Sequence, residues 1–325
     1  MSVPQLLRSE VVLEKYGKSL AGKTVLITGV SEQSIAGELA IQLAAADPKL
    51  LILSARNEPN ATPIIKQIKE SKPNVETRFL NMDLGDLSKI RQAVKEGLAD
   101  VPRIDHAVFV AGVMACPFSK TKDGFEMQFG VNYLANFLLV KLLLPKVQAA
   151  GPESSIIITS SAVMRQGKVH FDDLGFSDGK IYEPWAAYGQ SNAARTMFAK
   201  RLGEKLKSQG IRVFSIDPGS VNSGLQRHCP PGFMEMVKEW EKPGSLVDAD
   251  GNKFDMQPWA TQSEGAATII TGMIDSTISV VDYNGSFLSQ NAVANDHMHS
   301  HVRDERNITR LWEISEEMIQ EKYTW

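Results

Sequence analysis

The chain has 325 residues, of which 43% are apolar and 22% are charged, and its formal net charge is −3. This composition is typical of a globular protein that can build a sizeable core. The small net charge and the lack of a basic block argue against a nucleic-acid partner. The two cysteines, Cys116 and Cys229, are too few for a disulfide framework or a zinc site and fit a reducing compartment.

The N-terminus and the apolar runs indicate where the protein is expected to reside. The first residues, MSVPQLLRSEVVLEKYGK, carry charge throughout and contain no apolar signal core. The most apolar run, FLLVKLLLP at 137–145, is too short to span a bilayer and contains Lys141. We therefore expect a cytoplasmic protein with no membrane span.

Short apolar runs bounded by turn residues alternate with helical patterns along most of the chain. The runs predicted as buried strands are 24–29, 49–55, 75–83, 105–112, 155–161, 212–219 and, more weakly, 285–289. Helical patterns between them include IAGELAIQLAAA, FGVNYLANFLLVKLLLPKV and AAYGQSNAARTMFAKRLGEKLKSQG. This alternation predicts an α/β fold with one doubly wound parallel sheet of the Rossmann type and helices on both faces.

No linker interrupts the alternation, so residues 1–325 are predicted to form a single domain. Residues 220–260 follow the sixth strand, at the end of the sheet where such folds bind ligands, and are predicted to be a substrate lid. The lid residues that form either an apolar substrate wall or a packing surface are Phe233, Met234, Met236, Val237 and Trp240. The amphipathic tail helix 308–323 is expected to pack on the core or on a second subunit of a homodimer.

The turn after the first strand leads into a helix, a place where backbone N–H groups can bind a pyrophosphate. Gly29 suits a tight turn, but the next small positions are Ser34 and Ala36, and an ordinary strand–helix turn fits equally. Arg56 ends the second strand, where arginine suits a ribose 2′-phosphate, although a solvated arginine is the alternative. Asp83 ends the third strand and either meets an adenine or caps the next helix.

The stretch AYGQSNAART at 187–196 raises the question of catalysis. Tyr188, Ser191, Asn192 and Arg195 share one face of a helix because residues three, four and seven apart line up. A cation near the Tyr188 phenol would lower its pKa and prepare it for proton exchange. The position one turn along, however, holds the neutral Asn192.

The order of these motifs resembles the short-chain dehydrogenase/reductase superfamily over nearly the whole chain. The matching pieces are TG…SIAG, Asp83-Leu84, AGV at 111–113, Asn132, Ser161, Tyr188 and PGSVNS at 218–223. Four longer stretches resemble the retinol dehydrogenase and WW-domain oxidoreductase-like branch: FGVNYLANFLL, VHFDDLGFSDGKIYEPWAAYGQS, TQSEGAAT and LWEISEEMIQEKY.

The resemblance implies a role for each matching residue. Ser161 would orient a substrate carbonyl, Tyr188 would be the general acid/base, and Asn132 would hold a proton-relay water. Asn192 and Arg195 complete the candidate catalytic set. The residues implied to bind NADP(H) are Gly29, Ser31, Ser34, Ile35, Arg56, Asp83, Leu84, Ala111, Gly112, Tyr188, Pro218, Gly219, Val221 and Ser223. The resemblance implies no metal ion.

The chain also departs from the family pattern. Ser34 and Ala36 stand where the family carries glycines, and Phe109 and Val110 stand where it carries asparagines. Asn192 replaces the lysine that in this family binds the nicotinamide ribose and lowers the pKa of the tyrosine. A cation within ~4–6 Å is worth about one to three pKa units, so this replacement bears directly on catalysis.

Three interpretations remain open. In the first, Asn192 keeps the ribose hydrogen bonds and Arg195 supplies the charge. The spacing between Tyr188 and Arg195 and the Ser-Ile-Ala of the cofactor loop resemble the enoyl reductase branch of the superfamily, which supports this interpretation. The alternative for Arg195 is an exposed arginine without a role. In the second, a weakened enzyme is an isomerase or dehydratase. In the third, the protein binds a ligand without catalysis. We expect the first: an NADP(H)-dependent oxidoreductase acting on a carbonyl, alcohol or enone in a medium-sized, mostly apolar molecule.

His297, His299 and His301 alternate in DHMHSH and on a strand could hold a metal. Apart from Asp296 no acidic or cysteine partner is evident nearby, so a solvated loop is predicted instead.

Overall fold

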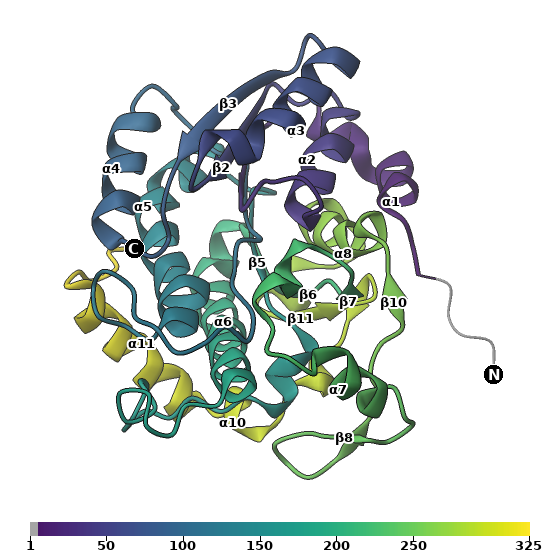
Figure 1. Cartoon of the computed structure of the whole chain (residues 1–325). Coiled ribbons are helices and arrows are strands. Elements are labelled where there is room, and N and C mark those ends of the chain that lie inside the picture. Colours follow the sequence, from purple (N-terminus) through teal and green to yellow (C-terminus); the bar gives the residue numbers. More distant parts are fainter. Residues whose placement is uncertain (1–5) are drawn as a thin grey trace.

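A computed structural model describes residues 6–325, and an eight-stranded sheet runs through the middle of this part of the chain (Figure 1). The strand order is β12-β11-β6-β5-β4-β1-β2-β3, and the strands pair in parallel except for the antiparallel pair β11–β12. The strands are β1 Thr24–Thr28, β2 Leu50–Ala55, β3 Glu76–Asn81, β4 His106–Phe109, β5 Ser155–Thr159, β6 Arg212–Asp217, β11 Phe287–Ser289 and β12 Ala292–Val293. The predicted parallel α/β sheet is confirmed.

The apolar runs of the sequence form the buried strands because helices cover both faces of the sheet. Every residue of β1, β2, β4, β5 and β6 is buried, whereas the edge strand β3 is largely half-buried or exposed. The helices on one face are α4 Leu87–Gly97, α5 Ala135–Ala150 and α6 Pro184–Leu206. Those on the other are α1 Ser9–Tyr16, α2 Ile35–Ala44, α3 Glu58–Ser71 and α8 Gln262–Ile274. The two faces have separate apolar cores.

The order of the strands reverses next to β1. Strands β2 and β3 lie on one side of β1, and β4, β5 and β6 lie on the other. In open sheets of this kind, ligands bind beyond the carboxyl ends of the strands at such a switch point. The functional site is therefore expected between the loops that follow β1 and β4.

The long apolar helix of the sequence begins earlier than the run 137–145. A π-helical segment, Phe129–Leu134, leads directly into α5, so the helical stretch extends over Phe129–Ala150. By length and composition this stretch could cross a membrane, and 78% of its most apolar window is buried inside the fold. Apolar composition here accompanies packing against the sheet and neighbouring helices. The absence of a membrane span stays a prediction.

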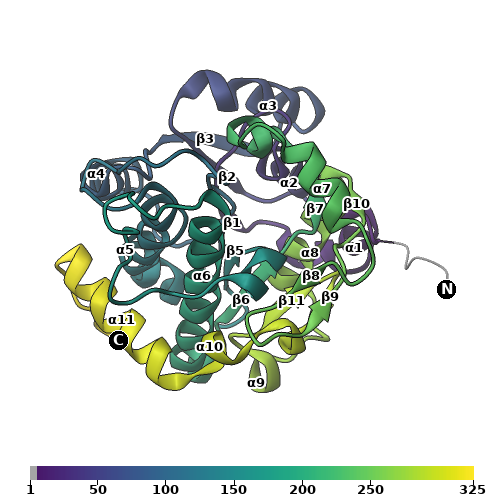
Figure 2. The same ribbon diagram turned by 60° about the horizontal axis from the view of Figure 1, so that its bottom comes forward.

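The lid segment 220–260 lies on the opposite side of the molecule from the C-terminal helix (Figures 1 and 2). It contains β7 Ser220–Val221, α7 Phe233–Trp240, the hairpin β8 Leu246–Val247 and β9 Lys253–Phe254, and β10 Trp259–Ala260. Several hydrogen bonds fasten the hairpin to the body; among them, Ala249 N–H donates to the Arg165 carbonyl at 2.8 Å, and Ser300 N–H donates to Asp250 Oδ2 at 2.7 Å.

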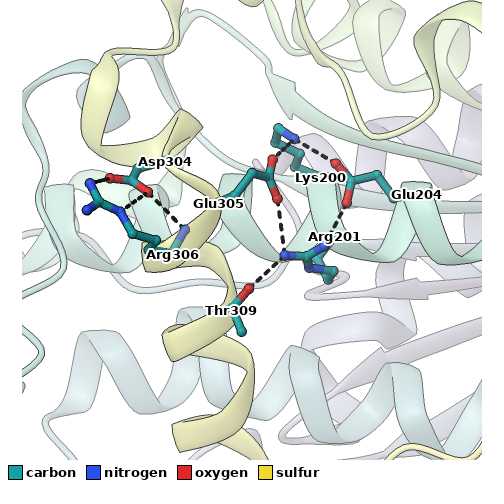
Figure 3. A network of polar contacts seen from close by, with 7 residues as sticks. All are labelled: Lys200, Arg201, Glu204, Asp304, Glu305, Arg306 and Thr309. Carbon is teal, nitrogen blue, oxygen red and sulfur yellow. Dashed lines mark hydrogen bonds and ion pairs between the residues drawn. The ribbon is translucent and has the colours of Figure 1, made fainter.

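The C-terminal helix α11, Glu305–Ile319, packs along α6 and reaches α5. It begins three residues before the predicted start at 308 because Asp304 caps it, accepting from Arg306 N–H at 2.8 Å. Glu305 forms ion pairs with Lys200 and Arg201 of α6 (Figure 3). Beyond the helix, the Tyr323 hydroxyl donates to the Phe137 carbonyl at 2.7 Å. The tail thus completes the core, as predicted, and the homodimer stays a prediction.

The remaining short elements connect these layers. They are the 3-10 turns Gly17–Leu20, Ala162–Gln166, Lys207–Gln209, Gly224–His228 and Asn295–His297, and the helices α9 Val280–Tyr283 and α10 Ser300–Arg303.

The histidine segment is not a solvated loop, so that prediction is wrong. The His299 side chain is 2% exposed, and its Nε2 lies 3.1 Å from the Met164 carbonyl oxygen and 2.9 Å from that of Gly167. His301 Nε2 accepts from Val169 N–H at 3.0 Å. The histidines therefore brace the loop that follows β5. Within residues 6–325, no three His, Cys, Asp or Glu side chains group together as metal ligands.

Candidate active site

Two adjoining cavities open beyond the carboxyl ends of the strands. The first, of about 400 Å³, lies under the lid and is called the substrate cavity here. The second, of about 430 Å³, lies over β1, β2 and β3 and is called the nucleotide cavity here. Residues that line both cavities are Ile35, Val110, Gly112, Val113, Ser223 and Leu225. The two hollows together form one continuous site at the switch point of the sheet.

All the predicted cofactor residues line this pair of cavities. Around the nucleotide cavity lie Gly29, Ser31, Ser34, Ile35, Arg56, Asp83, Leu84, Ala111, Gly112 and Ser223. Around the substrate cavity lie Tyr188, Pro218, Gly219 and Val221, together with Ile35, Gly112 and Ser223. The loops after five strands, β1, β2, β3, β4 and β6, therefore bring distant motifs of the sequence to one place.

The turn between β1 and α2 is tight for reasons that only the structure makes clear. Gly29 has a φ of +83°, and a Cβ there would lie 2.8 Å from the Cα of Ala111. Ser34 caps α2 by accepting from Gly37 N–H at 2.9 Å. A Cβ at Gly37 would lie 2.3 Å from the Ser31 carbonyl oxygen. Gly37, which the sequence analysis quoted in SIAG without giving it a role, is thus a glycine that close backbone approach requires in this turn, while Ser34 is a helix cap.

Asp83 does not cap the following helix, so that alternative is wrong. It accepts from Gly85 N–H at 2.9 Å, and its neighbour Asp86 caps α4 by accepting from Ser88 and Lys89. Hydrogen bonds from Ser88, followed by the contact with Lys122, lower the pKa of Asp86 to about 2 despite the opposing effect of desolvation. Asp83 remains at the wall of the nucleotide cavity.

Basic side chains surround the nucleotide cavity. Arg56 is joined there by Lys120, Lys122 and Arg227, which the sequence analysis did not identify. Lys120 pairs with Asp178 at 2.5 Å, and Lys122 pairs with Asp86 at 3.1 Å. No local motif marks these residues, because they come from a loop before α5 and from the lid.

Ser161 and Tyr188 both line the substrate cavity. Ser161 follows β5 and its hydroxyl accepts from Val163 N–H at 3.3 Å, which fixes the start of a 3-10 turn. Tyr188 lies in the first turns of α6 and is 7% exposed. Burial raises the pKa of Tyr188, while the positive charge of Arg195 and hydrogen bonding by Asn192 and Ser161 oppose that rise.

Asn132 is bonded to the protein through nearly all its polar atoms. Its Oδ1 accepts from Val113 N–H at 2.8 Å, and its Nδ2 donates to the Val113 carbonyl at 2.9 Å and to Ser191 Oγ at 3.0 Å. Its backbone carbonyl accepts from Asn136 Nδ2 at 2.7 Å and from Arg195 Nε. The side chain therefore fixes the loop after β4 against α6, and the carbonyl that faces α6 is already occupied.

Asn192 and Arg195 differ in where they point. Asn192 is fully buried, lines neither cavity, and donates its side-chain N–H to the Tyr188 carbonyl at 2.9 Å. Its predicted contact with the nicotinamide ribose stays a prediction. Arg195 is 3% exposed and lines the substrate cavity, so the exposed-arginine alternative is wrong. Burial lowers the pKa of Arg195 to about 10, which still leaves it cationic at neutral pH.

The lid supplies part of an apolar wall over the substrate cavity. Phe233, Val237 and Trp240 line it, whereas Met234 and Met236 do not. Trp185, which the sequence analysis missed, stacks on Phe233 with ring centroids 5.7 Å apart and meets Trp240 edge-on at 4.9 Å. Its position three residues before Tyr188 on α6 was the available signal, because such residues share a helix face.

Residues 23–231 match the family model described as short chain dehydrogenase. The chain belongs to the short-chain dehydrogenase family. It is 31% identical over 300 residues to human retinol dehydrogenase 11, covering 92% of this chain and 86% of that one. This short-chain dehydrogenase is thus an oxidoreductase with a retinol dehydrogenase-like sequence, as predicted.

Solved structures of low sequence identity share the fold of the short-chain dehydrogenase described here. An uncharacterized protein from Mycobacterium Paratuberculosis superposes with a TM-score of 0.70 at 22% identity, over 94% of this chain and 96% of that one. A short chain dehydrogenase from Burkholderia cenocepacia J2315, solved in complex with NADP, superposes with a TM-score of 0.62 at 19% identity, over 84% of this chain and 99% of that one.

Proposed function

We propose that the protein is an NADP(H)-dependent oxidoreductase that interconverts a carbonyl and an alcohol in a medium-sized, mostly apolar molecule. The observation that carries this proposal is that Ser161 and Tyr188 line the same cavity as Gly112, Pro218 and Gly219. A hydroxyl pair at one end and the cofactor-binding loops at the other would enclose a reacting carbonyl between them. The apolar lid closes the third side.

The site fits a dinucleotide. Helix α2 begins at the wall of the nucleotide cavity, which Ser34 and Ile35 line, and helix N-termini favour pyrophosphate. The close approach of Gly29 to Ala111 leaves no room there for a side chain. A bound nicotinamide would supply or accept the hydride. The structure of a relative in complex with NADP supports the same cofactor here.

The preference for NADP(H) over NAD(H) rests on charge. Arg56 stands at the end of β2 in place of an acidic residue, and Lys120 and Lys122 line the same cavity. A ribose 2′-phosphate brings an additional negative charge that these side chains can bind, whereas an unphosphorylated ribose gains little from them.

The chemistry of the protein's own groups follows from their protonation. In reduction, Ser161 donates a hydrogen bond to the substrate carbonyl oxygen, and the Tyr188 O–H gives that oxygen its proton. Burial raises the pKa of Tyr188, so the phenol is protonated at neutral pH and can act as the acid. In oxidation, the Tyr188 phenolate takes the proton from the alcohol.

The apolar wall indicates the class of substrate. Trp185, Phe233, Val237 and Trp240 offer aromatic and aliphatic surface rather than charge, which favours a ring-containing or long-chain apolar compound. The relative named retinol dehydrogenase acts, by its name, on an alcohol, and this supports a carbonyl–alcohol pair here.

Calorimetric titration with NADPH, NADH and their oxidised forms, followed by turnover of apolar ketones and enones, tests the proposal. Micromolar binding with a preference for the NADP(H) pair and reduction of a ketone are expected. Reduction of an enone only at its carbon–carbon bond would replace the proposal with an enoyl reductase. Failure to bind any form of the cofactor would refute the oxidoreductase and favour the isomerase, dehydratase or ligand-binding alternative that Asn192 raised.

A further inference from the structure

Arg195 is a buried cation without a buried anion. Its side chain is 3% exposed, and within residues 6–325 it forms no ion pair with an acidic side chain. Two backbone carbonyls hold it instead: Nε donates to Asn132, and Nη2 donates to Ala111 at 2.5 Å. Burial of an unpaired charge is costly, so such a group indicates a ligand or partner that the charge serves.

The guanidinium retains free hydrogen-bonding capacity on the cavity side. It has five N–H donors, and the two carbonyls take one each from Nε and Nη2. Arg195 lines the substrate cavity beside Gly112, where a Cβ would lie 3.4 Å from Nη2 and 3.5 Å from Nη1. Gly112 therefore leaves the guanidinium in contact with the cavity at the junction with the nucleotide cavity.

Tyr188 lies seven positions before Arg195 on the same helix, and both side chains line the substrate cavity. Burial raises the pKa of Tyr188, and the charge of Arg195 is the first of the effects that oppose that rise. Asn192 lies between them in the helix but has turned its amide to the Tyr188 carbonyl. The charge beside the phenol thus comes from position 195 and not from position 192.

We propose that Arg195 performs two tasks in this chain: it stabilises the Tyr188 phenolate by its charge, and it donates hydrogen bonds to the nicotinamide ribose hydroxyls. The first task stands on the protein alone, and the second rests on the proposed NADP(H) function. Asn192 is then the compensating change, because a lysine there would place a second cation one turn away in a buried site.

The position of Arg195 also decides the path of the proton. During reduction the Tyr188 O–H bond breaks, its proton goes to the former carbonyl oxygen, and its electron pair remains on the phenolate beside the guanidinium. The phenolate must then take a proton from water. Arg195 Nε donates a hydrogen bond to the Asn132 carbonyl. Because an arginine stays protonated, Arg195 does not relay protons. Tyr188 is therefore reprotonated from the substrate cavity after the product leaves.

Ultraviolet titration of the tyrosine in the cofactor-free protein tests the first task. The Tyr188 signal is obtained by subtracting the titration curve of a Tyr188→Phe variant. This subtraction is made once in the parent background and once in the Arg195→Gln background, and the two difference curves are compared. Glutamine can keep one carbonyl hydrogen bond without the charge. We expect Arg195→Gln to shift the onset of Tyr188 ionisation to higher pH than in the parent, and Arg195→Lys to restore much of the parent behaviour. An unchanged pKa in Arg195→Gln overturns the proposal.

Calorimetry with NADPH tests the second task. Arg195→Gln should bind NADPH about 10-fold or more weakly, which corresponds to the loss of a charge-assisted hydrogen bond. Lys200→Gln is the matched control because Lys200 lies on the same helix but in the exposed network with Glu204 and Glu305. It should bind NADPH as the parent does. Equal affinity of Arg195→Gln and the parent would refute the ribose contact.

A second variant covers the case in which Arg195→Gln does not fold. The double change Asn192→Lys with Arg195→Asn keeps one cation on this face of α6, and we expect it to fold and to keep the Tyr188 pKa close to that of the parent chain. Unfolding of this double variant contradicts the proposal. So does a Tyr188 pKa that is clearly higher in the folded double variant than in the parent chain. If the parent chain itself binds no NADPH, the proposed function fails, while the titration still decides whether Arg195 stabilises the phenolate.

Discussion

Asn192 donates its side-chain amide N–H to the backbone carbonyl of Tyr188, 2.9 Å away within the same helix. The amide is thereby held against α6, and its Oδ1 is buried with no hydrogen-bond partner among the described residues. The cavity side of the helix is left to Arg195, which reaches across to Asn132 and Ala111. On this face of α6, the positive charge therefore lies at position 195 and not at position 192.

A lysine at position 192 should be tolerated only when Arg195 is absent. In the parent background, Asn192→Lys adds a second buried cation and should lower the free energy of unfolding more than it does in the Arg195→Asn background. We expect a coupling of about 1–3 kcal/mol, measured by denaturant unfolding of the four proteins of the double-mutant cycle. Equal costs of Asn192→Lys in the two backgrounds would show that the two positions do not compete.

The two hydroxyls of the substrate cavity should carry most of the rate. Tyr188→Phe removes the proton donor and should lower kcat/KM by about 10²–10⁴-fold. Ser161→Ala removes a hydrogen bond to the reacting oxygen and should cost about 10²–10³-fold. Tyr16→Phe, which removes a phenol hydroxyl away from both cavities, is the control. Steady-state reduction of an apolar ketone measures all three, and a Tyr188→Phe enzyme as active as the control would exclude the tyrosine as acid.

Arg56 should set the choice of cofactor. Arg56→Ser removes a positive charge at the end of β2, and we expect NADPH to bind about 10- to 100-fold more weakly while NADH binding is unchanged. Lys66→Met removes an exposed charge on α3 that pairs with Glu70 outside the cavities, and it should alter neither affinity. Equal loss of NADPH and NADH affinity in Arg56→Ser would point to a general folding effect.

His106 should make the protein sensitive to acid. Burial lowers its pKa to about 4, and its Nδ1 lies 2.9 Å from Ser155 Oγ. The unfolded chain takes up this proton near its ordinary value while the folded state resists it, so stability is full above pH ~6.5 and falls as the pH drops toward 4. At about 1.4 kcal/mol per pKa unit, the loss reaches about 3 kcal/mol.

Comparison of three proteins isolates the contribution of His106. His106→Asn should flatten the decline in the free energy of unfolding between pH 6.5 and 4, measured by urea unfolding at each pH. His170→Gln changes an exposed histidine and should leave the decline as it is in the parent. The same slope in His106→Asn and in the parent would assign the acid sensitivity to other groups.

The sequence was sufficient for the sheet because each central strand is buried on both faces and is therefore apolar throughout. The run predicted at 24–29, for example, is β1 at Thr24–Thr28. Ser161 and Tyr188 were placed by motif order, since Ser161 follows a predicted strand and Tyr188 lies within a predicted helix. The placement of these two side chains at one cavity followed from the fold class.

The features that sequence analysis missed depend on contacts between distant segments. Arg195 was included in the candidate catalytic set, but its contacts could not be predicted because its partner carbonyls, Asn132 and Ala111, lie 63 and 84 residues away in the chain. A polar residue on a helix is more often solvated than buried. The role of Gly37 was missed because it depends on the path of the Ser31 carbonyl, and Lys120 was overlooked because its loop carries no periodic pattern.

Transfer of deuterium to an apolar ketone from NADPH that carries deuterium at both C4 positions of the nicotinamide tests the central claim most directly. Mass spectrometry of the alcohol product reads the outcome, with the parent chain compared to Tyr188→Phe under the same conditions. The account predicts an alcohol that carries the deuterium on its carbinol carbon with the parent, and a rate lowered by about 10²–10⁴-fold with Tyr188→Phe. An alcohol without the deuterium, or no alcohol from any apolar ketone despite bound NADPH, would contradict it.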